Sequence, residues 1–236
     1  MKSLEEFLKE TRYPGRFMVI GMLKGMAVIL YGATGRSPSS LKRRFIELED
    51  GIYMTAIDAT VAIEGNPELL EYPAVRFFEK GIAAANGTHI ERLDPLQGRD
   101  ARQQLSYALA DEAYEPDEHW TPRITGCVIE SNAFDAAFHI IRSSTSGIDR
   151  SSWTLDMKDG TGYYISTYRG DDVKPTPSFS GEPVHLAFSY NSAAEAAKAL
   201  SASLAPARGE TDYRVAFIAV FKALGKEPEV SILNAH

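Results

Sequence analysis

The chain has 236 residues, 44% of them hydrophobic and 24% charged, and its 25 Lys and Arg against 32 Asp and Glu give a net charge of −7. This ordinary globular composition and length suit one large domain, and we predict a single domain over 1–236. The negative charge argues against general nucleic-acid binding, which needs basic surface to neutralise many phosphates. A local basic cluster could still hold one anionic group, because screening confines exposed charges to about 10 Å at moderate salt.

Cysteine use and the apolar runs bound the location of the protein. Cys127 is the only cysteine, which excludes an intrachain disulfide, and no Cys and His spacing resembles a structural zinc site. Residues 1–10 lack the apolar core of a signal peptide, and no run approaches the roughly 20 apolar residues that span a bilayer. We therefore expect a cytoplasmic protein without a metal site or a membrane partner.

The first third of the chain is predicted to begin a sheet. Ser3 and Glu6 have capping-box spacing and predict a short amphipathic helix over 3–10, in an N-terminal arm of residues 1–12. Two apolar runs about a Gly21–Gly25 turn predict a β-hairpin, and a loop follows over 32–40. The strands expected in this part are 16–20, 26–31, 45–48, 53–58, 61–63 and 81–85.

The rest of the chain mixes helices with a meander of strands. Helices are predicted over 100–113 and 192–201, the second with Ser192 as N-cap. Antiparallel pairing is the simplest connection for the strands between them. The runs expected to form these strands, with a last apolar segment, are 124–130, 136–141, 153–157, 163–168 and 215–224. This alternation predicts an α+β protein.

An acid-rich segment, residues 114–123, precedes the apolar run 124–129 and carries three carboxylates, a histidine and an arginine. Its two prolines restrict the residues before them, so Glu115 and Thr121 should be extended. A carboxylate with a pKa raised by its neighbours could serve as a general acid or base, although a solvated acidic loop also fits. Arg123 enters a buried strand and needs either a carboxylate partner or a bound anion.

Several other residues allow two interpretations. Arg36, Lys42, Arg43 and Arg44 surround residues 37–40 and suit either a phosphate site or a solvated basic loop. Tyr72 could donate a hydrogen bond or pack as a partly buried ring. Cys127 and His139 lie in apolar runs and are interpreted as a core thiol and a strand residue. No glycine-rich stretch has the spacing of a phosphate-binding or dinucleotide-binding loop.

Several short motifs follow one another along the chain. They are Tyr13-Pro-Gly-Arg16, Gly35-Arg-Ser-Pro38, Tyr72, Ala85-Asn-Gly-Thr-His89, Tyr114-Glu-Pro-Asp-Glu118, Thr121-Pro-Arg123 and Ser166-Thr-Tyr168. Taken in this order, they resemble the archaeal-type IMP cyclohydrolase family. The resemblance covers roughly residues 13–170, and the ordering of the motifs is more specific than any one of them.

This resemblance implies a four-layer α-β-β-α sandwich with two mostly antiparallel sheets, like that of the N-terminal-nucleophile hydrolases. It also implies ring closure of 5-formamidoimidazole-4-carboxamide ribonucleotide to IMP and water, without a cofactor. Purine nucleotides would be the substrate and product, whereas the oligomeric state, including a homo-oligomer, is left open. The chain begins Met1-Lys2 rather than with a nucleophile, which disfavours autoproteolytic amide hydrolysis and a covalent intermediate.

The resemblance also implies roles for individual residues. The catalytic residues would be Arg36, Tyr72, Glu115 and Asp117, of which the first two polarise substrate oxygens and the acids transfer protons. The substrate-binding residues would be Arg16, Ser37, Arg44, Asn86, Gly87, Thr88 and Arg123. A nucleotide-binding protein that lacks the chemistry is the alternative function, and the presence of proton-transfer groups favours the enzyme.

Overall fold

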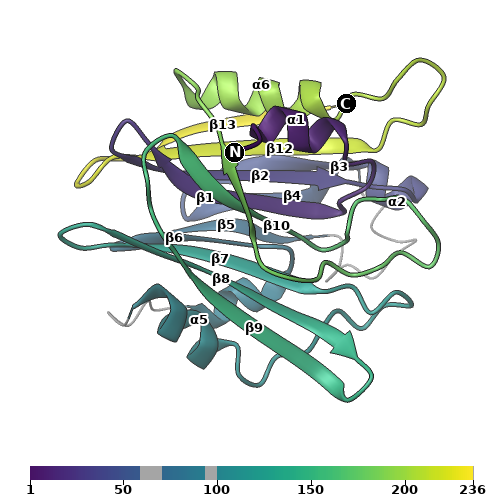
Figure 1. Ribbon diagram of the computed structural model, residues 1–236, viewed down its shortest axis with the longest axis horizontal. Coiled ribbons are helices and arrows are strands. Elements are labelled where there is room, and N and C mark those ends of the chain that lie inside the picture. Colours follow the sequence, from purple (N-terminus) through teal and green to yellow (C-terminus); the bar gives the residue numbers. More distant parts are fainter. Residues whose placement is uncertain (59–70, 94–99, 236) are drawn as a thin grey trace.

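The computed structural model of the protein describes residues 1–58, 71–93 and 100–235 (Figure 1). Two antiparallel sheets dominate the described chain, one of six strands in the order β11-β10-β1-β2-β12-β13 and one of seven in the order β3 to β9. The strands of the first sheet are β1 (Arg16–Leu23), β2 (Met26–Thr34), β10 (Thr161–Ser166), β11 (Val184–Ala187), β12 (Arg214–Lys222) and β13 (Glu229–Asn234). Those of the second are β3 (Arg43–Leu48), β4 (Gly51–Ala56), β5 (Tyr72–Phe78), β6 (Gly81–Ala85), β7 (Arg123–Glu130), β8 (Phe134–Ser144) and β9 (Gly147–Leu155).

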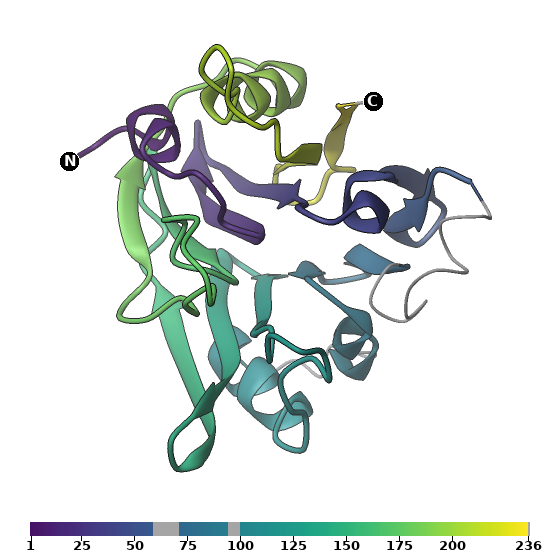
Figure 2. The ribbon, with the colours of Figure 1, turned by 90° about the vertical axis from the view of Figure 1, so that its right-hand side faces the viewer.

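Short helices cover the outer faces of the two sheets. Helices α1 (Leu4–Lys9) and α6 (Ala193–Ser203) contact each other, and α6 packs on β12 and β13. On the other sheet, α5 (Ala101–Ala108) packs on β8, with a 3-10 helix, η1 (Thr88–Leu93), beside β5 and β6. Figure 2 shows the two sheets stacked between these helices. Helix α2 (Pro38–Leu41) connects β2 to β3 and lies at one end of the sheets.

The expected N-terminal helix and β-hairpin are both present. The Ser3 hydroxyl and the Glu6 carboxylate form the capping box that starts α1. The hairpin turn is Lys24–Gly25, where both φ angles are positive, and not the longer Gly21–Gly25 turn that we expected. Gly21 lies within β1. A glycine is required there because a Cβ would come 2.1 Å from the Thr161 carbonyl oxygen of the neighbouring strand. Its role is a close approach of two backbones.

Other boundaries also differ from the sequence prediction. The helix expected over 100–113 ends at Ala108, and the strand expected over 153–157 is the end of the longer β9. Strand β5 was missed because Pro73 reads as a break, yet it sits where the pairing of β4 with β5 shifts register and no amide hydrogen is required. The elements α2, η1, β11 and β13 were missed as well, and the strand expected over 61–63 lies outside the described residues.

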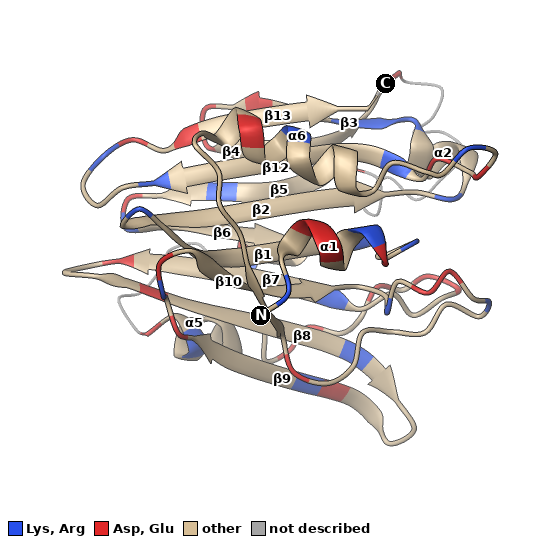
Figure 3. Cartoon of the chain, turned by 45° about the horizontal axis from the view of Figure 1, so that its top comes forward, with Lys and Arg blue, Asp and Glu red and all other residues tan. Residues whose placement is uncertain are grey.

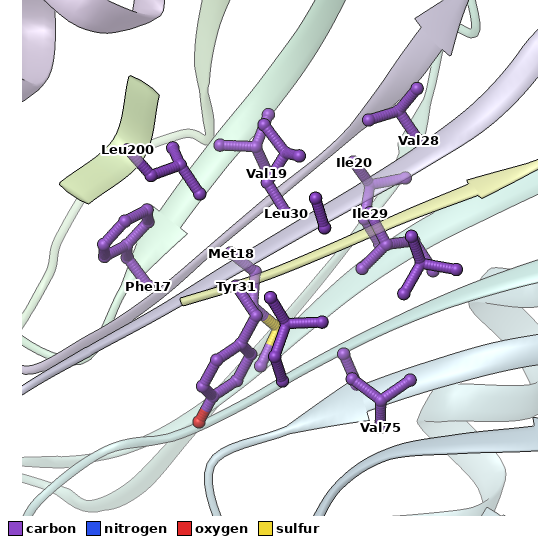
Figure 4. Packing of buried hydrophobic residues seen from close by; sticks show 14 of the residues in the cluster. Phe17, Met18, Val19, Ile20, Val28, Ile29, Leu30, Tyr31, Val75 and Leu200 are labelled. Carbon is purple, nitrogen blue, oxygen red and sulfur yellow. The ribbon is translucent and has the colours of Figure 1, made fainter. Parts of the chain in front are cut away.

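The main core lies between the sheets and continues under α6. Successive residues of β1 and β2 point to opposite faces, so both faces of these strands are apolar. In Figure 4, Phe17 lies near Leu200 of α6, whereas Tyr31 extends to the opposite side of its strand, the side on which Val75 of the other sheet lies. The sheets approach closely at Gly126, where a Cβ would come 2.6 Å from the Ile20 side chain. A second cluster under α5 includes Cys127, whose burial confirms the interpretation as a core thiol.

His139 makes the stability of this core depend on pH. Its Nδ1 is 2.7 Å from the Ser152 hydroxyl, and burial, followed by the charge of Arg150, lowers its pKa from 6.5 to about 4. Below pH 6.5 the unfolded chain therefore takes up a proton that the folded protein does not, and stability is lost as the pH falls. We expect His139 to contribute a loss of about 2 kcal/mol in the free energy of unfolding between pH 7 and pH 5.

Chemical denaturation at both pH values gives the change in the free energy of unfolding between pH 7 and pH 5. The difference in this change between wild type and His139→Gln measures the contribution of His139. The exposed His185, which stacks on Tyr163, is the matched control. His185→Gln should leave the pH dependence of stability unchanged. Equal pH dependence of wild type and His139→Gln would contradict the prediction.

Candidate active site

The predicted site residues gather at the end of the two sheets where α2 lies. β1, β3 and β7 begin at this end, and β2 and β6 finish there, so the antiparallel order brings distant parts of the chain together (Figure 1). The acid-rich segment crosses the same end directly before β7. Figure 3 shows basic residues where β3 starts beside α2, while other acidic and basic residues are scattered over the visible chain.

Glu115 is the centre of the buried polar cluster. Its Oε1 accepts hydrogen bonds from Nη2 of Arg16 at 2.5 Å and from Nδ2 of Asn86 at 2.7 Å. Asn86 is fixed in turn, since it donates to the Pro122 carbonyl and accepts from the Ile124 amide at 2.7 Å. In the described part of the chain, Oε1 is the only side-chain oxygen of Glu115 with a hydrogen bond, so Oε2 remains free to accept a proton.

Burial sets the charge balance of this cluster. Glu115 is 3% exposed, and its desolvation raises the pKa of the carboxyl above the ordinary value, although the charge of Arg16 offsets part of the rise. For Arg16, burial opposes the charged form, but Glu115 and nearby tyrosines keep the pKa well above its ordinary value. The pair is therefore a buried guanidinium beside a carboxylate that gains a proton more readily than an exposed glutamate.

Asp117 has a different setting from Glu115. Both of its oxygens are occupied by the turn, because Oδ1 accepts from the Thr121 amide at 2.8 Å and Oδ2 from the Thr121 hydroxyl at 2.5 Å. The Thr121 hydroxyl also lies 2.6 Å from that of Tyr168, and the Thr121 carbonyl accepts from the Glu115 amide. Asp117 thus holds the backbone that presents Glu115.

Two tyrosines bring hydroxyl groups into the space between the sheets. Tyr72 on β5 is 2% exposed, and its hydroxyl is 3.2 Å from that of Tyr31 on β2. Burial, followed by the neighbouring Tyr72, raises the pKa of Tyr31 well above 10, so it stays protonated. Such a hydroxyl pair can donate one hydrogen to a substrate oxygen while the second tyrosine supports the first.

Arg36 lies on the outer side of this cluster. It forms an ion pair with Asp172 at 3.3 Å and donates to the Thr176 hydroxyl, and its guanidinium stacks over the Tyr13 ring at 4.2 Å. The Tyr13 ring stacks on Tyr168, which connects Arg36 to the turn that holds Glu115. The charge of Arg36 is therefore balanced by a carboxylate.

Two neighbouring arginines of β3 differ in burial. Arg43 is 3% exposed and Arg44 points to solvent, as expected from the alternation of a strand. The Nε of Arg43 donates to the Ser40 carbonyl, and in the described chain no carboxylate pairs with this guanidinium. The structure therefore places Arg43 toward the cluster and Arg44 away from it.

Two other residues expected to bind substrate lie at the edge. The Ser37 hydroxyl caps α2 by accepting from the Ser40 amide and is exposed. Thr88 is half-buried at the start of η1, beside the buried Gly87. Gly87 faces Arg123, because a Cβ there would come 3.1 Å from Nη1 of that arginine. Arg123 forms an ion pair with none of the three carboxylates of the acid-rich segment but contacts His89 at 2.9 Å.

The structure thus brings Arg16, Asn86 and Glu115 into direct contact, with Asp117 and Tyr72 in the surrounding polar shell. Tyr31 was missed by our sequence reasoning, and Arg43 was considered only as one member of the basic cluster around residues 37–40. Four further residues stood in the family motifs without an assigned role, namely Tyr13, His89, Thr121 and Tyr168. The alternation of β3 could have revealed Arg43, since Arg43 and Phe45 share one face, but that strand was expected to start only at Phe45. No sequence pattern pointed to Tyr31, which lies in an apolar run.

Within the described residues, no three His, Cys, Asp or Glu side chains are grouped to hold a metal ion. No helix in the same part of the chain is long and apolar enough to cross a membrane. What the arrangement offers chemically is a desolvated carboxylate with a free oxygen, hydroxyl donors, and guanidinium groups around them. These are the components of general acid/base catalysis on a small anionic substrate.

The fold and the site define an α+β protein with two antiparallel sheets and an enzyme-like polar centre at one end of the sheets. Comparison with known proteins agrees, since residues 13–224 match the model of the IMP cyclohydrolase-like protein family. The chain belongs to this family.

Curated relatives carry the same family name. The IMP cyclohydrolase of Methanocaldococcus jannaschii is 27% identical over 157 residues, which cover 66% of this chain and 73% of that protein. The IMP cyclohydrolase of Methanococcus aeolicus is 28% identical over 66% of this chain and 74% of its own. That of Thermococcus kodakarensis is 31% identical over 50% and 56%.

Proposed function

We propose that the protein is an IMP cyclohydrolase that closes the purine ring of 5-formamidoimidazole-4-carboxamide ribonucleotide, giving IMP and water. The observation that carries this proposal is the buried Glu115 with a free oxygen, held by Arg16 and Asn86 in a member of the IMP cyclohydrolase-like family. A protein that only binds nucleotides has no need of a desolvated carboxylate beside a hydroxyl pair.

The reaction requires two proton transfers. The carboxamide nitrogen bonds to the formyl carbon and loses one proton, while the formyl oxygen gains a proton and becomes a hydroxyl. That hydroxyl then leaves as water with the proton of the former formamido nitrogen, and a carbon–nitrogen double bond completes the ring. Because an amide nitrogen is a weak nucleophile, the site must hold the two groups in contact and stabilise charge on oxygen.

We assign the proton transfers to Glu115. Its free Oε2 can accept the amide proton and pass it to the formyl oxygen, and can then carry the proton of the former formamido nitrogen to the departing hydroxyl; its raised pKa suits both steps near neutral pH. Tyr72, supported by Tyr31, would donate to the formyl oxygen. Asp117, with both oxygens committed to Thr121, would act as a positioning residue.

Charge considerations assign the ends of the nucleotide. Arg16 and Arg36 are paired with carboxylates, whereas in the described chain Arg43 and Arg123 are not, so these two retain charge for a phosphate. Arg43 starts β3, two strands from Tyr72 on β5, and Arg123 starts β7, two strands beyond β5 on the other side. Arg36 over Tyr13 would form the outer wall of the site.

The remaining features of the proposal follow the family resemblance. We infer that residues 1–236 form one domain with the four-layer α-β-β-α arrangement of the N-terminal-nucleophile hydrolases, acting in the cytoplasm on purine nucleotides. The helices on the outer face of each sheet support this arrangement.

Incubation of the pure protein with the formamido ribonucleotide, followed by absorbance, tests the proposal. Formation of IMP by wild type is the expected result. Tight binding of IMP without any turnover would support the alternative, a nucleotide-binding protein on the same scaffold. The absence of both turnover and nucleotide binding would contradict the proposed enzyme and the alternative binding protein.

Arg43 and Arg44 allow a matched test of the anion site. Arg43→Met should raise the KM for the ribonucleotide on the order of 10- to 100-fold, because a hydrogen-bonded charge pair is lost. Arg44→Met should leave the KM within about twofold, since an exposed charge contributes little. Steady-state kinetics measure both, and equal effects of the two variants would contradict the placement of Arg43.

A further inference from the structure

The partner of Arg123 is an imidazole. Nη1 of Arg123 lies 2.9 Å from Nδ1 of His89, and Nε2 of His89 lies 2.9 Å from the hydroxyl of Thr125. His89 is 2% exposed and Thr125 is fully buried, so the contact between them is closed to water, whereas the contact with the half-buried Arg123 is part-buried. Other site arginines differ, because Arg16 and Arg36 are paired with carboxylates.

The contact with Arg123 fixes the protonation state of His89. A guanidinium only donates, so Nδ1 must accept with its lone pair and the ring must carry its hydrogen on Nε2. The Nε2–H group then donates to the Thr125 hydroxyl. Burial, followed by the charge of Arg123, holds the pKa of His89 well below its usual range, which keeps the ring neutral.

Local structure fixes the direction in which Arg123 points. His89 is the second residue of η1, which begins directly after the buried Gly87. A Cβ on Gly87 would come 3.1 Å from Nη1 of Arg123 and 3.3 Å from Nδ1 of His89. Only a glycine leaves this contact undisturbed. Thr125 follows Arg123 by two residues on β7 and lies on the same face of the strand. One strand therefore holds both residues that contact His89.

On these grounds we propose that His89 is a positioning residue, which as a neutral imidazole anchored on Thr125 directs Arg123 toward the phosphate of the bound nucleotide. A carboxylate in the place of His89 would orient the guanidinium equally well but would neutralise it. The imidazole orients it and leaves its positive charge for the ligand. The inference rests on the proposed function for the identity of the ligand.

A double-mutant cycle tests whether His89 acts through Arg123. His89→Leu should raise the KM for the ribonucleotide about tenfold or more, as expected when a charged hydrogen bond loses its alignment, and should change kcat by less than about threefold. His89→Asn, which retains an acceptor near the position of Nδ1, should recover most of the affinity. In the Arg123→Ala background, His89→Leu should have no further effect on KM.

Several results would overturn the inference. One is an equal rise in KM from His89→Leu with and without Arg123, and another is a His89→Leu variant that leaves the KM unchanged. If His89→Leu does not fold, Thr125→Val carries the cycle in its place and is expected to raise the KM only when Arg123 is present. If wild type makes no IMP, the proposed function fails first, and the Kd for IMP from calorimetry replaces KM in the same cycle.

Discussion

Replacing Glu115 with glutamine is expected to lower the rate of IMP formation by about 100-fold or more, the usual contribution of a positioned general acid or base. Glutamine keeps the size of the side chain and can still accept from Arg16 and Asn86, but it no longer takes up a proton. Initial rates at saturating substrate measure the effect. The exposed Glu118, three residues further on, is the matched control, and Glu118→Gln should retain full activity.

The pH dependence distinguishes loss of chemistry from loss of structure. Since burial raises the pKa of Glu115, the activity of wild type should fall on the acid side with an apparent pKa above 4.5, and the remaining activity of Glu115→Gln should lack this limb. The variant also leaves the buried charge of Arg16 without its counter-ion, which can cost about 3–5 kcal/mol of stability. Thermal unfolding and IMP binding must therefore be measured alongside the rates.

Assignment of the base to Glu115 makes a clear distinction from Asp117. Asp117→Asn should reduce activity less than Glu115→Gln does, because an amide can still accept one of the hydrogen bonds from Thr121 that hold the turn. A larger loss for Asp117→Asn, with Glu115→Gln retaining at least a tenth of the wild-type rate, would reverse the two roles.

The second large effect is expected for Tyr72→Phe, with a loss of kcat on the order of 100-fold, as found when one donor to a developing oxyanion is removed. The hydroxyl lies between the sheets, 3.2 Å from that of Tyr31, and phenylalanine has no group that can donate in its place. Tyr53→Phe is the control, because the Tyr53 hydroxyl donates to the Asp50 carboxylate in the β3–β4 turn, away from the cluster. It should change kcat by less than about twofold.

Kinetics of the combined variant complete this prediction. If Tyr72 and Glu115 act on different atoms of the substrate, the double variant Tyr72→Phe with Glu115→Gln should lose more activity than either single change. A total loss of only about tenfold in turnover, worth about 1.4 kcal/mol, would count against both assignments. Unchanged KM in Tyr72→Phe would agree with a hydrogen bond that forms mainly in the transition state.

Much of the fold could be anticipated because local chemistry agrees with it. The capping box of Ser3 and Glu6, the alanine-rich α6 and the apolar runs of β1, β2 and β7 are all signals that neighbouring residues carry by themselves. Where local chemistry misleads, prediction failed. Pro73 reads as a strand break, yet the pairing of β4 with β5 shifts at this point and spares the missing amide hydrogen.

The candidate site divides in the same way. The acid-rich segment, with its two prolines, marked Glu115 and Arg123 from the sequence alone, and the order of the motifs related the chain to its family. Residue type and spacing could not distinguish Glu115 from Asp117, because the difference lies in which carboxylate keeps a free oxygen. That depends on Asn86 and Arg16, which are distant in sequence and adjacent only in the folded sheets.

By itself, then, the sequence determined an α+β protein of this family with proton-transfer groups before β7. Only the tertiary structure decided which arginines are neutralised and which keep their charge. Strand alternation turns Arg43 inward and Arg44 outward. Arg123 contacts His89 and not a carboxylate, with Gly87 packed against both side chains. The physical reason is that burial and partnership set the charge of a side chain, and both arise from residues far apart along the chain.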